Sequence, residues 1–245
     1  MKKKRITEFL GKYYALSLNN DFLNLRPATV TRLVFLATFL RYREDSLYRT
    51  KRTPMHRTDL PQILKISRVT SDRFMEEVCP NYIWEDSEGN LHMNSKVFFY
   101  GPVSKEMGAH QKIYMRAVKE LYNCTPTGNL KHIGYILKIL PFVNIEHNIL
   151  CHNPYTPNFN EVEPMILQEF CEKVGLASDR STVARLKRAY ASLVFELDGK
   201  SHNFCNLLFT NHGEGYIIYL NPRILYSGSD YEGMQLLAAS MLKME

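Results

Sequence analysis

Hydrophobic residues recur at helical spacing between Ser178 and Leu197 (SDRSTVARLKRAYASLVFEL). At about 100° per residue, one side of a helix collects Val183, Leu186, Tyr190 and Leu193. The other side collects basic and small residues: Arg180, Ser181, Ala184, Arg185, Lys187 and Arg188. Ser178 is a suitable N-cap, and the β-branched and aromatic pair Val194-Phe195 indicates that a strand follows. The pattern predicts a capped basic helix followed by a strand.

A similar arrangement occurs upstream. The segment Thr58–Leu64 reads as a short helix, Lys65-Ile66 as a turn, and Ser67–Val78 as a second helix capped by Ser67. Two alternating segments, 82–85 and 91–94, then flank the polar turn 86–90, in which Gly89 supplies the positive φ that a hairpin loop needs. Helix, turn, capped helix and hairpin are therefore predicted in this order.

The same order recurs around the Ser178 helix. A short helix over 163–174, with Pro164 at its start, precedes it. Strands at 193–197, 204–209 and 216–220 follow, separated by turns at Asp198-Gly199 and 211–215. A capped basic helix followed by a hairpin is the order of a DNA-recognition helix and its wing. We therefore expect an α+β, mostly helical fold of two winged helix-turn-helix domains in tandem, each with a β-hairpin wing.

The remaining pattern gives approximate boundaries. Further helices are predicted over 28–42, 113–122, 130–140 and 231–243. The segment 6–25 is apolar enough to dock as a strand or a helix. Lys2–Arg5 reads as a short basic arm, for which a disordered terminus is favoured over a phosphate or minor-groove contact. Trp84 is expected in the core, because strand alternation pairs it with Tyr82. The predicted domains are 1–25 (arm and docking segment), 26–105 (first winged helix) and 106–245 (second winged helix with a C-terminal helix).

The upstream capped helix has a less uniform outer face. Its predicted buried side contains Ser71, Phe74, Met75 and Val78. On the far side, Val69 can touch a thymine methyl group, and Arg68 or Arg73 can pair with a guanine edge, with Thr70 beside them. Asp72 and Glu76 also lie on the far side and weaken a phosphate-binding interpretation. Contact with DNA and contact with a protein both remain open for this helix.

The charge distribution favours a polyanionic partner. The chain has a net charge of +6, and residues 1–105 hold 18 Lys and Arg against 11 Asp and Glu. Neutralising phosphates releases counterions, which supplies most sequence-independent affinity for DNA. Lys51 and Arg52 lie in a predicted loop that can run beside a DNA backbone. A solvated basic face on an ordinary globular protein is the alternative.

Signals for catalysis or metal binding are weak. The five cysteines never occur in CxxC spacing, and His147, Cys151 and His152 form the only cluster that resembles metal-ligand spacing. Gly199-Lys200-Ser201 ends like a phosphate-binding loop, but Val194 occupies the position of the required earlier glycine. We expect no catalytic residue, no metal, no cofactor and no enzymatic activity. Apolar stretches are too short or interrupted to span a membrane, so a cytoplasmic location is expected.

Four segments together carry a resemblance: LKISRVTSDRFMEEV, IWEDSEGNLHMNSKVFFYG, ILPFVNIEHNILCHNP and YLNPRILYSG. From about Pro27 to Gly228 the chain resembles the tandem winged-helix replication-initiator or regulatory proteins of plasmids and phages of Gram-positive bacteria. The resemblance implies sequence-specific binding to duplex repeats at an origin or operator, with helicase or polymerase activity supplied by other proteins.

Three functional hypotheses follow. The first is a double-stranded-DNA binder that acts in replication initiation or transcription regulation, with self-association or replication or transcription proteins as further partners. The second is a winged-helix protein-interaction module. The third is a DNA-processing nuclease whose site the sequence does not reveal.

Overall fold

The structure is a computed structural model that describes residues 2–103, 108–210 and 215–243. Within these residues the chain is an α+β fold of nine α-helices and small antiparallel sheets. This agrees with the predicted class. The predicted domain boundary at 105/106 and most of the predicted turn 211–215 lie outside the described residues.

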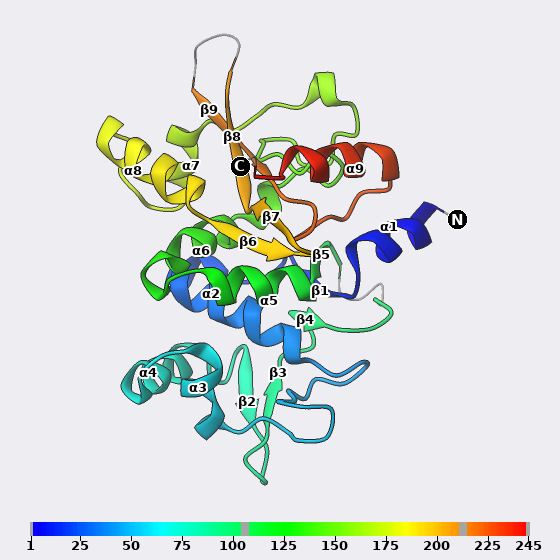
Figure 1. Cartoon of the computed structure of the whole chain (residues 1–245). Helices are drawn as coiled ribbons and strands as arrows, with labels where there is room; N and C mark the ends of the chain where they lie inside the picture. The colour runs from blue at the N-terminus through cyan, green and yellow to red at the C-terminus, as the bar shows by residue number, and fades with distance from the viewer. Residues whose placement is uncertain (1, 104–107, 211–214, 244–245) are drawn as a thin grey trace.

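The helices and strands follow in a fixed order along the chain (Figure 1). The helices are α1 (Lys2–Leu10), α2 (Pro27–Leu36), α3 (Leu60–Leu64), α4 (Arg68–Val78), α5 (Met115–Cys124), α6 (Leu130–Lys138), α7 (Leu167–Lys173), α8 (Arg180–Ala191) and α9 (Tyr231–Ser240). The strands are β1 (Tyr13–Ser17), β2 (Ile83–Glu85), β3 (Leu91–Met93), β4 (Phe98–Phe99), β5 (His110–Tyr114), β6 (Val194–Leu197), β7 (Lys200–Asn203), β8 (Cys205–Phe209) and β9 (Tyr216–Leu220).

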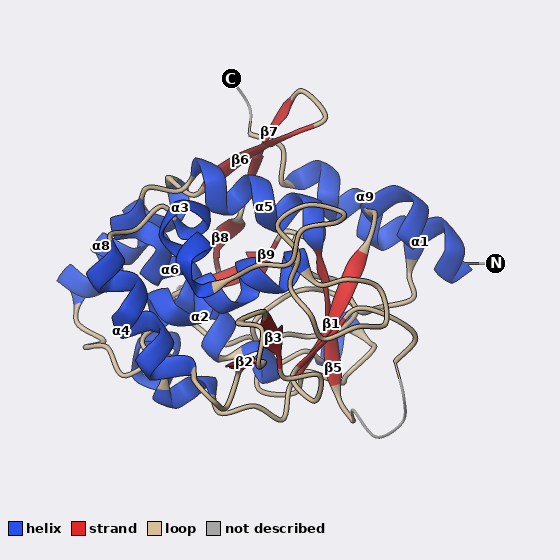
Figure 2. Cartoon of the chain, turned by 90° about the horizontal axis from the view of Figure 1, so that it is seen from below, coloured by secondary structure: helices blue, strands red, loops and turns tan. Residues whose placement is uncertain are grey.

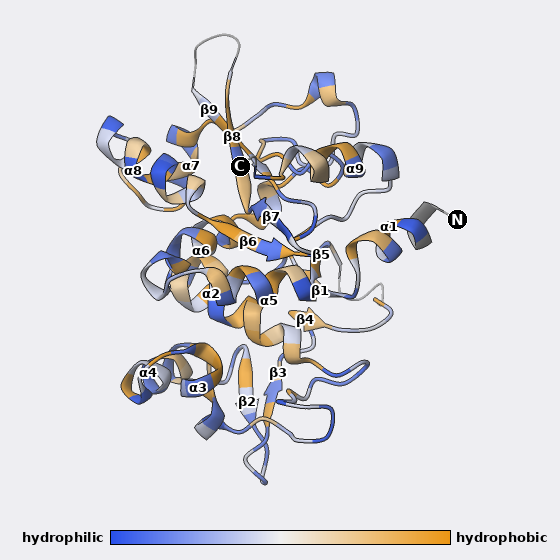
Figure 3. Ribbon diagram, viewed as in Figure 1, coloured by the Kyte–Doolittle hydropathy of each residue, from blue (hydrophilic) through white to orange (hydrophobic). Residues whose placement is uncertain are grey.

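Two apolar helices, α2 and α6, pack against each other at the centre of the molecule (Figures 1 and 3). Gly134 allows them to approach closely, because a β-carbon at this position would lie 1.8 Å from the carbonyl oxygen of Pro27. The hydroxyl of Thr31 donates a hydrogen bond across the contact to the carbonyl oxygen of Leu130, at 2.8 Å. The pair therefore fixes the position of one half of the chain relative to the other.

The same order of elements occurs on both sides of this pair. After α2 come a connecting segment, α3, α4 and the β2–β3 hairpin. After α6 come a connecting segment, α7, α8, an extra β6–β7 hairpin and the β8–β9 hairpin. Each connecting segment pairs with the second strand of its hairpin, through Leu47 and Leu91 in the first half and through Leu150 and Ile218 in the second. Figure 1 shows the first set below α2 and the second set above α6.

A three-stranded antiparallel sheet joins the halves. Its order is β4-β1-β5, with Ala15 of β1 opposite Phe99 and Lys112. One continuous cluster of buried hydrophobic residues also includes both Phe74 of the first half and Phe170 of the second. The segment 13–17, which the sequence left open between strand and helix, therefore holds the two halves together.

The N-terminal segment docks as predicted, but its first residues are helical. Ile6 and Leu10 of α1 are buried with Tyr114, Tyr226 and Met234, beside α9. The expectation of a disordered arm at Lys2–Arg5 was wrong, because the apolar positions that follow anchor a helix that begins at Lys2.

Four local expectations also need correction. The helix predicted over 28–42 ends at Leu36 and continues only as a 3₁₀ turn to Phe39. The helix predicted from 113 begins at Met115, after the unpredicted strand β5. Strand β7 was not predicted. Trp84 is 39% exposed rather than buried in the core, although Tyr82 is buried as expected.

No helix in the described parts of the chain combines the length and hydrophobicity that crossing a bilayer requires.

Candidate nucleic-acid interface

Helix α8 has the two faces that the sequence predicts. Val183, Leu186 and Tyr190 are buried, and Leu193 is buried directly after the helix. The opposite face is exposed and contains Arg180, Ser181, Ala184, Arg185 and Arg188. Among the described residues, none of these three arginines forms a salt bridge. Three guanidinium groups are therefore available to an external anion.

The N-cap of α8 is Asp179, not Ser178 as expected. Its carboxylate accepts hydrogen bonds from the backbone N–H groups of Ser181 and Thr182, at 2.8 and 3.0 Å. The hydroxyls of the same two residues also donate to it. These hydrogen bonds lower the pKa of Asp179. A carboxylate accepts more of the free N–H groups at a helix start than a hydroxyl can, which explains the one-residue shift.

Lys187 points away from the exposed face. Its ammonium group lies 3.5 Å from the centre of the Tyr216 ring on β9, a cation–π contact. The structure therefore separates Lys187 from the other predicted α8 residues and places it between the helix and the β8–β9 hairpin.

Helix α4 also matches its predicted pattern. Ser67 is the N-cap, and its hydroxyl accepts the backbone N–H of Thr70 at 3.2 Å. The predicted buried residues Ser71, Phe74, Met75 and Val78 are buried. Arg68, Val69 and Arg73 are exposed, and Val69 is 61% exposed. A large apolar side chain in water next to cations is a feature of a contact surface.

One of the two acids predicted on the far side of α4 is paired. Arg57, in the turn before α3, lies 3.0 Å from Asp72 and 4.0 Å from Glu85 at the end of β2. The sequence did not single out Arg57, because the partners are 15 and 28 positions away in the chain. Glu76 remains exposed.

The two helices lie on the same side of the molecule. Figure 1 shows α4 and α8 at the left edge, below and above α6, and Figure 2 also places both on the left. Lys131, at the start of α6, is also exposed. Burial, the charge of Lys131 and the charge of Arg185 together lower the pKa of His132, so these cations gather around one buried ring. Lys131 is a second basic residue that sequence reasoning missed.

Lys51 and Arg52 are not brought to this surface. They occupy a tight turn between Tyr48 and Pro54, which form a β-bridge. Lys51 lines a groove with Arg41, Arg49 and Lys119. In Figure 1 the blue segment that contains this turn lies on the opposite side of the β2–β3 hairpin from α4.

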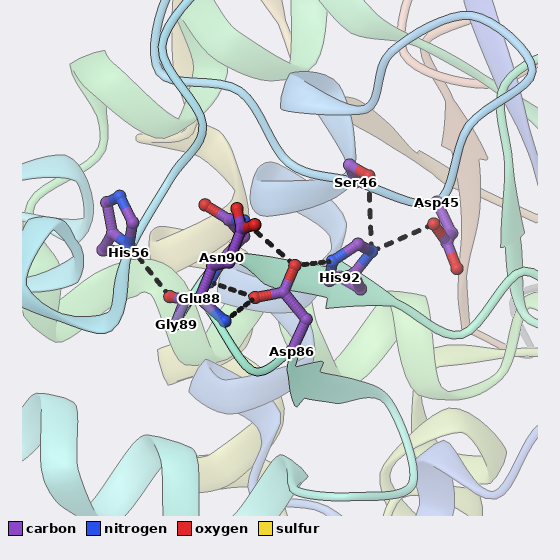
Figure 4. A network of polar contacts seen from close by, with 8 residues as sticks. All are labelled: Asp45, Ser46, His56, Asp86, Glu88, Gly89, Asn90 and His92. Atoms are coloured by element: carbon purple, nitrogen blue, oxygen red, sulfur yellow. Dashed lines mark hydrogen bonds and ion pairs between the residues drawn. The ribbon is translucent and has the colours of Figure 1, made fainter.

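The first hairpin is held by a histidine between two carboxylates (Figure 4). His92 Nδ1 lies 3.0 Å from Asp45, and its Nε2 lies 3.1 Å from Asp86 at the hairpin turn. The ring of Trp84 stacks on His92 with centroids 4.1 Å apart. Gly89 has the predicted positive φ of 79°, and its carbonyl oxygen lies 3.0 Å from His56 Nδ1. The turn is thereby fixed to the connecting segment.

The second half contains two hairpins that differ in position. The β6–β7 turn, with Asp198 and Gly199 at positive φ, packs against α5, where Asp198 lies 2.7 Å from Arg116. The β8–β9 hairpin lies beside α7 and α8, with Gly215 against Ile166 and Tyr216 under Lys187. Of the two hairpins, β8–β9 has the position that β2–β3 has beside α4.

The His147, Cys151 and His152 segment does not converge. Cys151 is buried, His147 Nε2 lies 2.9 Å from the Pro157 carbonyl oxygen, and His152 lies 3.4 Å from Glu169. Within the described residues, no group of three or more His, Cys, Asp or Glu side chains is placed to hold a metal ion.

The chain matches no protein-family model, and comparisons with the curated proteins and with the solved structures find no significant match.

Proposed function

We propose that the chain binds double-stranded DNA through α8 and α4, which act as the recognition helices of two winged-helix units. The observation that supports this proposal most strongly is the exposed face of α8. Three arginines that have no salt-bridge partner in the described part of the chain flank Ser181 and Ala184, while buried Val183, Leu186 and Tyr190 anchor the opposite face. Small residues between cations let a helix backbone approach a groove closely, and arginine pairs with guanine or with phosphate.

The position of α4 supports the proposal. It is capped, exposes Arg68, Val69 and Arg73, and lies on the same side of the molecule as α8. Lys131, at the start of α6, is a further exposed cation. Exposed cations together with an apolar side chain suit a duplex, because phosphates supply affinity and thymine methyl groups supply apolar contacts.

The hairpins also have positions that suit wings. The β2–β3 and β8–β9 hairpins follow α4 and α8, and each pairs with the segment that precedes its helices. We assign the second wing to β8–β9, because the Asp198 turn is bound to α5 through Arg116.

The biological process that we propose for this DNA binding is replication initiation or transcription regulation of a plasmid or phage. This step relies on the resemblance of the four sequence segments. A protein contact through α4 is a second candidate, favoured by the exposure of both Glu76 and Val69 on this helix.

Selection of bound sequences from a random duplex library, followed by titration of the selected duplex at two salt concentrations, tests the proposal. We expect a defined sequence and an affinity that falls steeply with salt, with a slope in log–log form of about −0.9 per neutralised phosphate. Failure to enrich any sequence, together with salt-independent or absent binding, would leave the protein-contact candidate ahead.

A further inference from the structure

A groove remote from α4 and α8 is lined by four cationic side chains. Its residues come from the turn after α2, from the segment 48–51 and from α5: Thr38, Phe39, Leu40, Arg41, Tyr48, Arg49, Thr50, Lys51 and Lys119. None of the described residues that line it is Asp or Glu. Its volume is about 520 Å³, within the roughly 300–1,000 Å³ of small-ligand sites.

Lys119 makes the groove more than a solvated basic patch. Its ammonium group is partly buried and lies 4.3 Å from the centre of the Phe39 ring. Within the described residues, Lys119 has no carboxylate partner. Burial lowers the pKa of Lys119, which means that its charge is poorly compensated. An anion in the groove would supply that compensation.

The two arginines are only partly satisfied elsewhere. Arg41 lies 3.5 Å from Glu44, and its guanidinium also lies over the Tyr48 ring, 4.9 Å from its centre. Arg49 lies 3.0 Å from Asp59. Both arginine side chains are about half exposed, and a guanidinium has five N–H donors, so donors remain for a ligand. Lys51 is exposed and has no salt-bridge partner among the described residues.

The chemistry of the lining selects phosphate charge over a nucleobase. Cations lie over the rings of Phe39 and Tyr48, the two aromatic residues of the groove. A face that carries a cation is less available for stacking a base. A partly buried ammonium is also harder for the convex backbone of a duplex to reach than for a compact anion.

We propose that this groove binds a small oligophosphate, an anion with two or three linked phosphate groups. Lys119 contacts one phosphate at the floor, and Arg41, Arg49 and Lys51 contact the others at the rim. The site explains the basic turn at Lys51, which the DNA-binding surface does not include.

Calorimetric titration of the full chain with sodium tripolyphosphate and pyrophosphate tests the proposal. We expect saturable binding, tighter for tripolyphosphate than for orthophosphate. Lys119→Gln and Lys51→Gln should each weaken it by about tenfold or more, the size expected for one lost charge-assisted hydrogen bond. Lys96→Gln, which removes an exposed cation outside the groove, should bind like the wild type.

Circular dichroism checks that each variant is folded. Because Lys51 is exposed, Lys51→Gln still tests the proposal if Lys119→Gln is destabilised. Absence of saturable binding by the wild type at millimolar tripolyphosphate would overturn the proposal. Equal weakening in Lys96→Gln would also overturn it, because the attraction would then be general. Displacement of tripolyphosphate by duplex DNA at equal phosphate concentration would overturn it as well and assign the groove to a nucleic-acid backbone.

Discussion

Gly134 of α6 lies against the carbonyl oxygen of Pro27 in α2, and a β-carbon on Gly134 would lie 1.8 Å from that oxygen. The contact joins the helices that precede the two candidate recognition units. The spacing between α4 and α8 therefore depends on a close approach that only glycine permits.

Gly134→Ala should destabilise the protein. Alanine gains about 1 kcal/mol of helix propensity over glycine, but the overlap with a backbone carbonyl forces α2 and α6 apart, and overpacking typically costs about 1–3 kcal/mol or more. Urea unfolding measures the change. Gly128→Ala is the matched control, because a β-carbon there meets nothing within 4 Å. Equal midpoints for the two variants would show that the α2–α6 contact is not tight.

The halves should not fold when separated. Strand β1 pairs with β4 of the first half and with β5 of the second, and one hydrophobic cluster spans both. We expect fragments 1–103 and 108–245 to be insoluble or unfolded alone, and to regain structure only when they are coexpressed. Cooperative unfolding of either isolated fragment would show that the predicted domains 26–105 and 106–245 are independent units.

His92 should make the first hairpin sensitive to pH. Burial alone would lower the pKa of His92, but hydrogen bonds and charge from Asp45 and Asp86 outweigh it and raise that pKa. Because the pKa of His92 is higher in the folded state than in the unfolded state, protonation of His92 stabilises the fold. This stabilisation is complete below the unfolded-state pKa of about 6.5 and is lost as the pH rises through the folded-state pKa.

Wild type should therefore be more stable than His92→Gln at pH 5.5, and the difference should shrink by pH 8. Urea unfolding at both pH values measures this. His110→Gln is the control, because His110 contacts only a backbone carbonyl in the described structure. If the difference in unfolding free energy between the wild type and His92→Gln grew toward pH 8, it would contradict a charged His92 between the two carboxylates.

Local sequence patterns predicted the parts of the fold that local chemistry determines. Ser67 caps α4, Gly89 has a positive φ, and the buried face of α8 is the one that helical periodicity selects. Each depends on residues within four positions of one another.

Long-range packing determines what the sequence did not reveal. Trp84 lies outside the core, 39% exposed, and its ring stacks on its cross-strand partner His92. Arg32 of α2 is buried although its side chain is charged. Lys187 turns to Tyr216, and Arg57 pairs with Asp72. None of these partners is close in the chain, so periodicity carries no signal for them.

If α4 and α8 enter the major groove on one face of a duplex, their contacts should be separated by one helical turn. Hydroxyl-radical footprinting of the selected duplex should show two protected segments with centres about 10 to 10.5 base pairs apart, or a multiple of this spacing. A single short protected segment, with the same footprint in the wild type and in the double variant Arg68→Ala/Arg73→Ala, would show that α4 does not contact DNA.

Single arginine substitutions on α8 distinguish base contacts from phosphate contacts. Loss of a bidentate guanine contact by Arg185→Ala should cost about 1 to 3 kcal/mol and relax preference at one base position. Loss of a phosphate contact should weaken binding on all sequences and reduce the salt slope by about one unit. Unfolding midpoints should not change, because the side chain is exposed.

The most direct measurement of the central claim compares duplex affinity in Ala184→Glu and Ala239→Glu. Both alanines are exposed on helices, but only Ala184 lies among the α8 arginines. A carboxylate at 184 would face DNA phosphates. The account predicts that Ala184→Glu loses binding to the selected duplex while remaining folded, and that Ala239→Glu binds like the wild type. Wild-type affinity in Ala184→Glu would contradict the claim that α8 binds DNA.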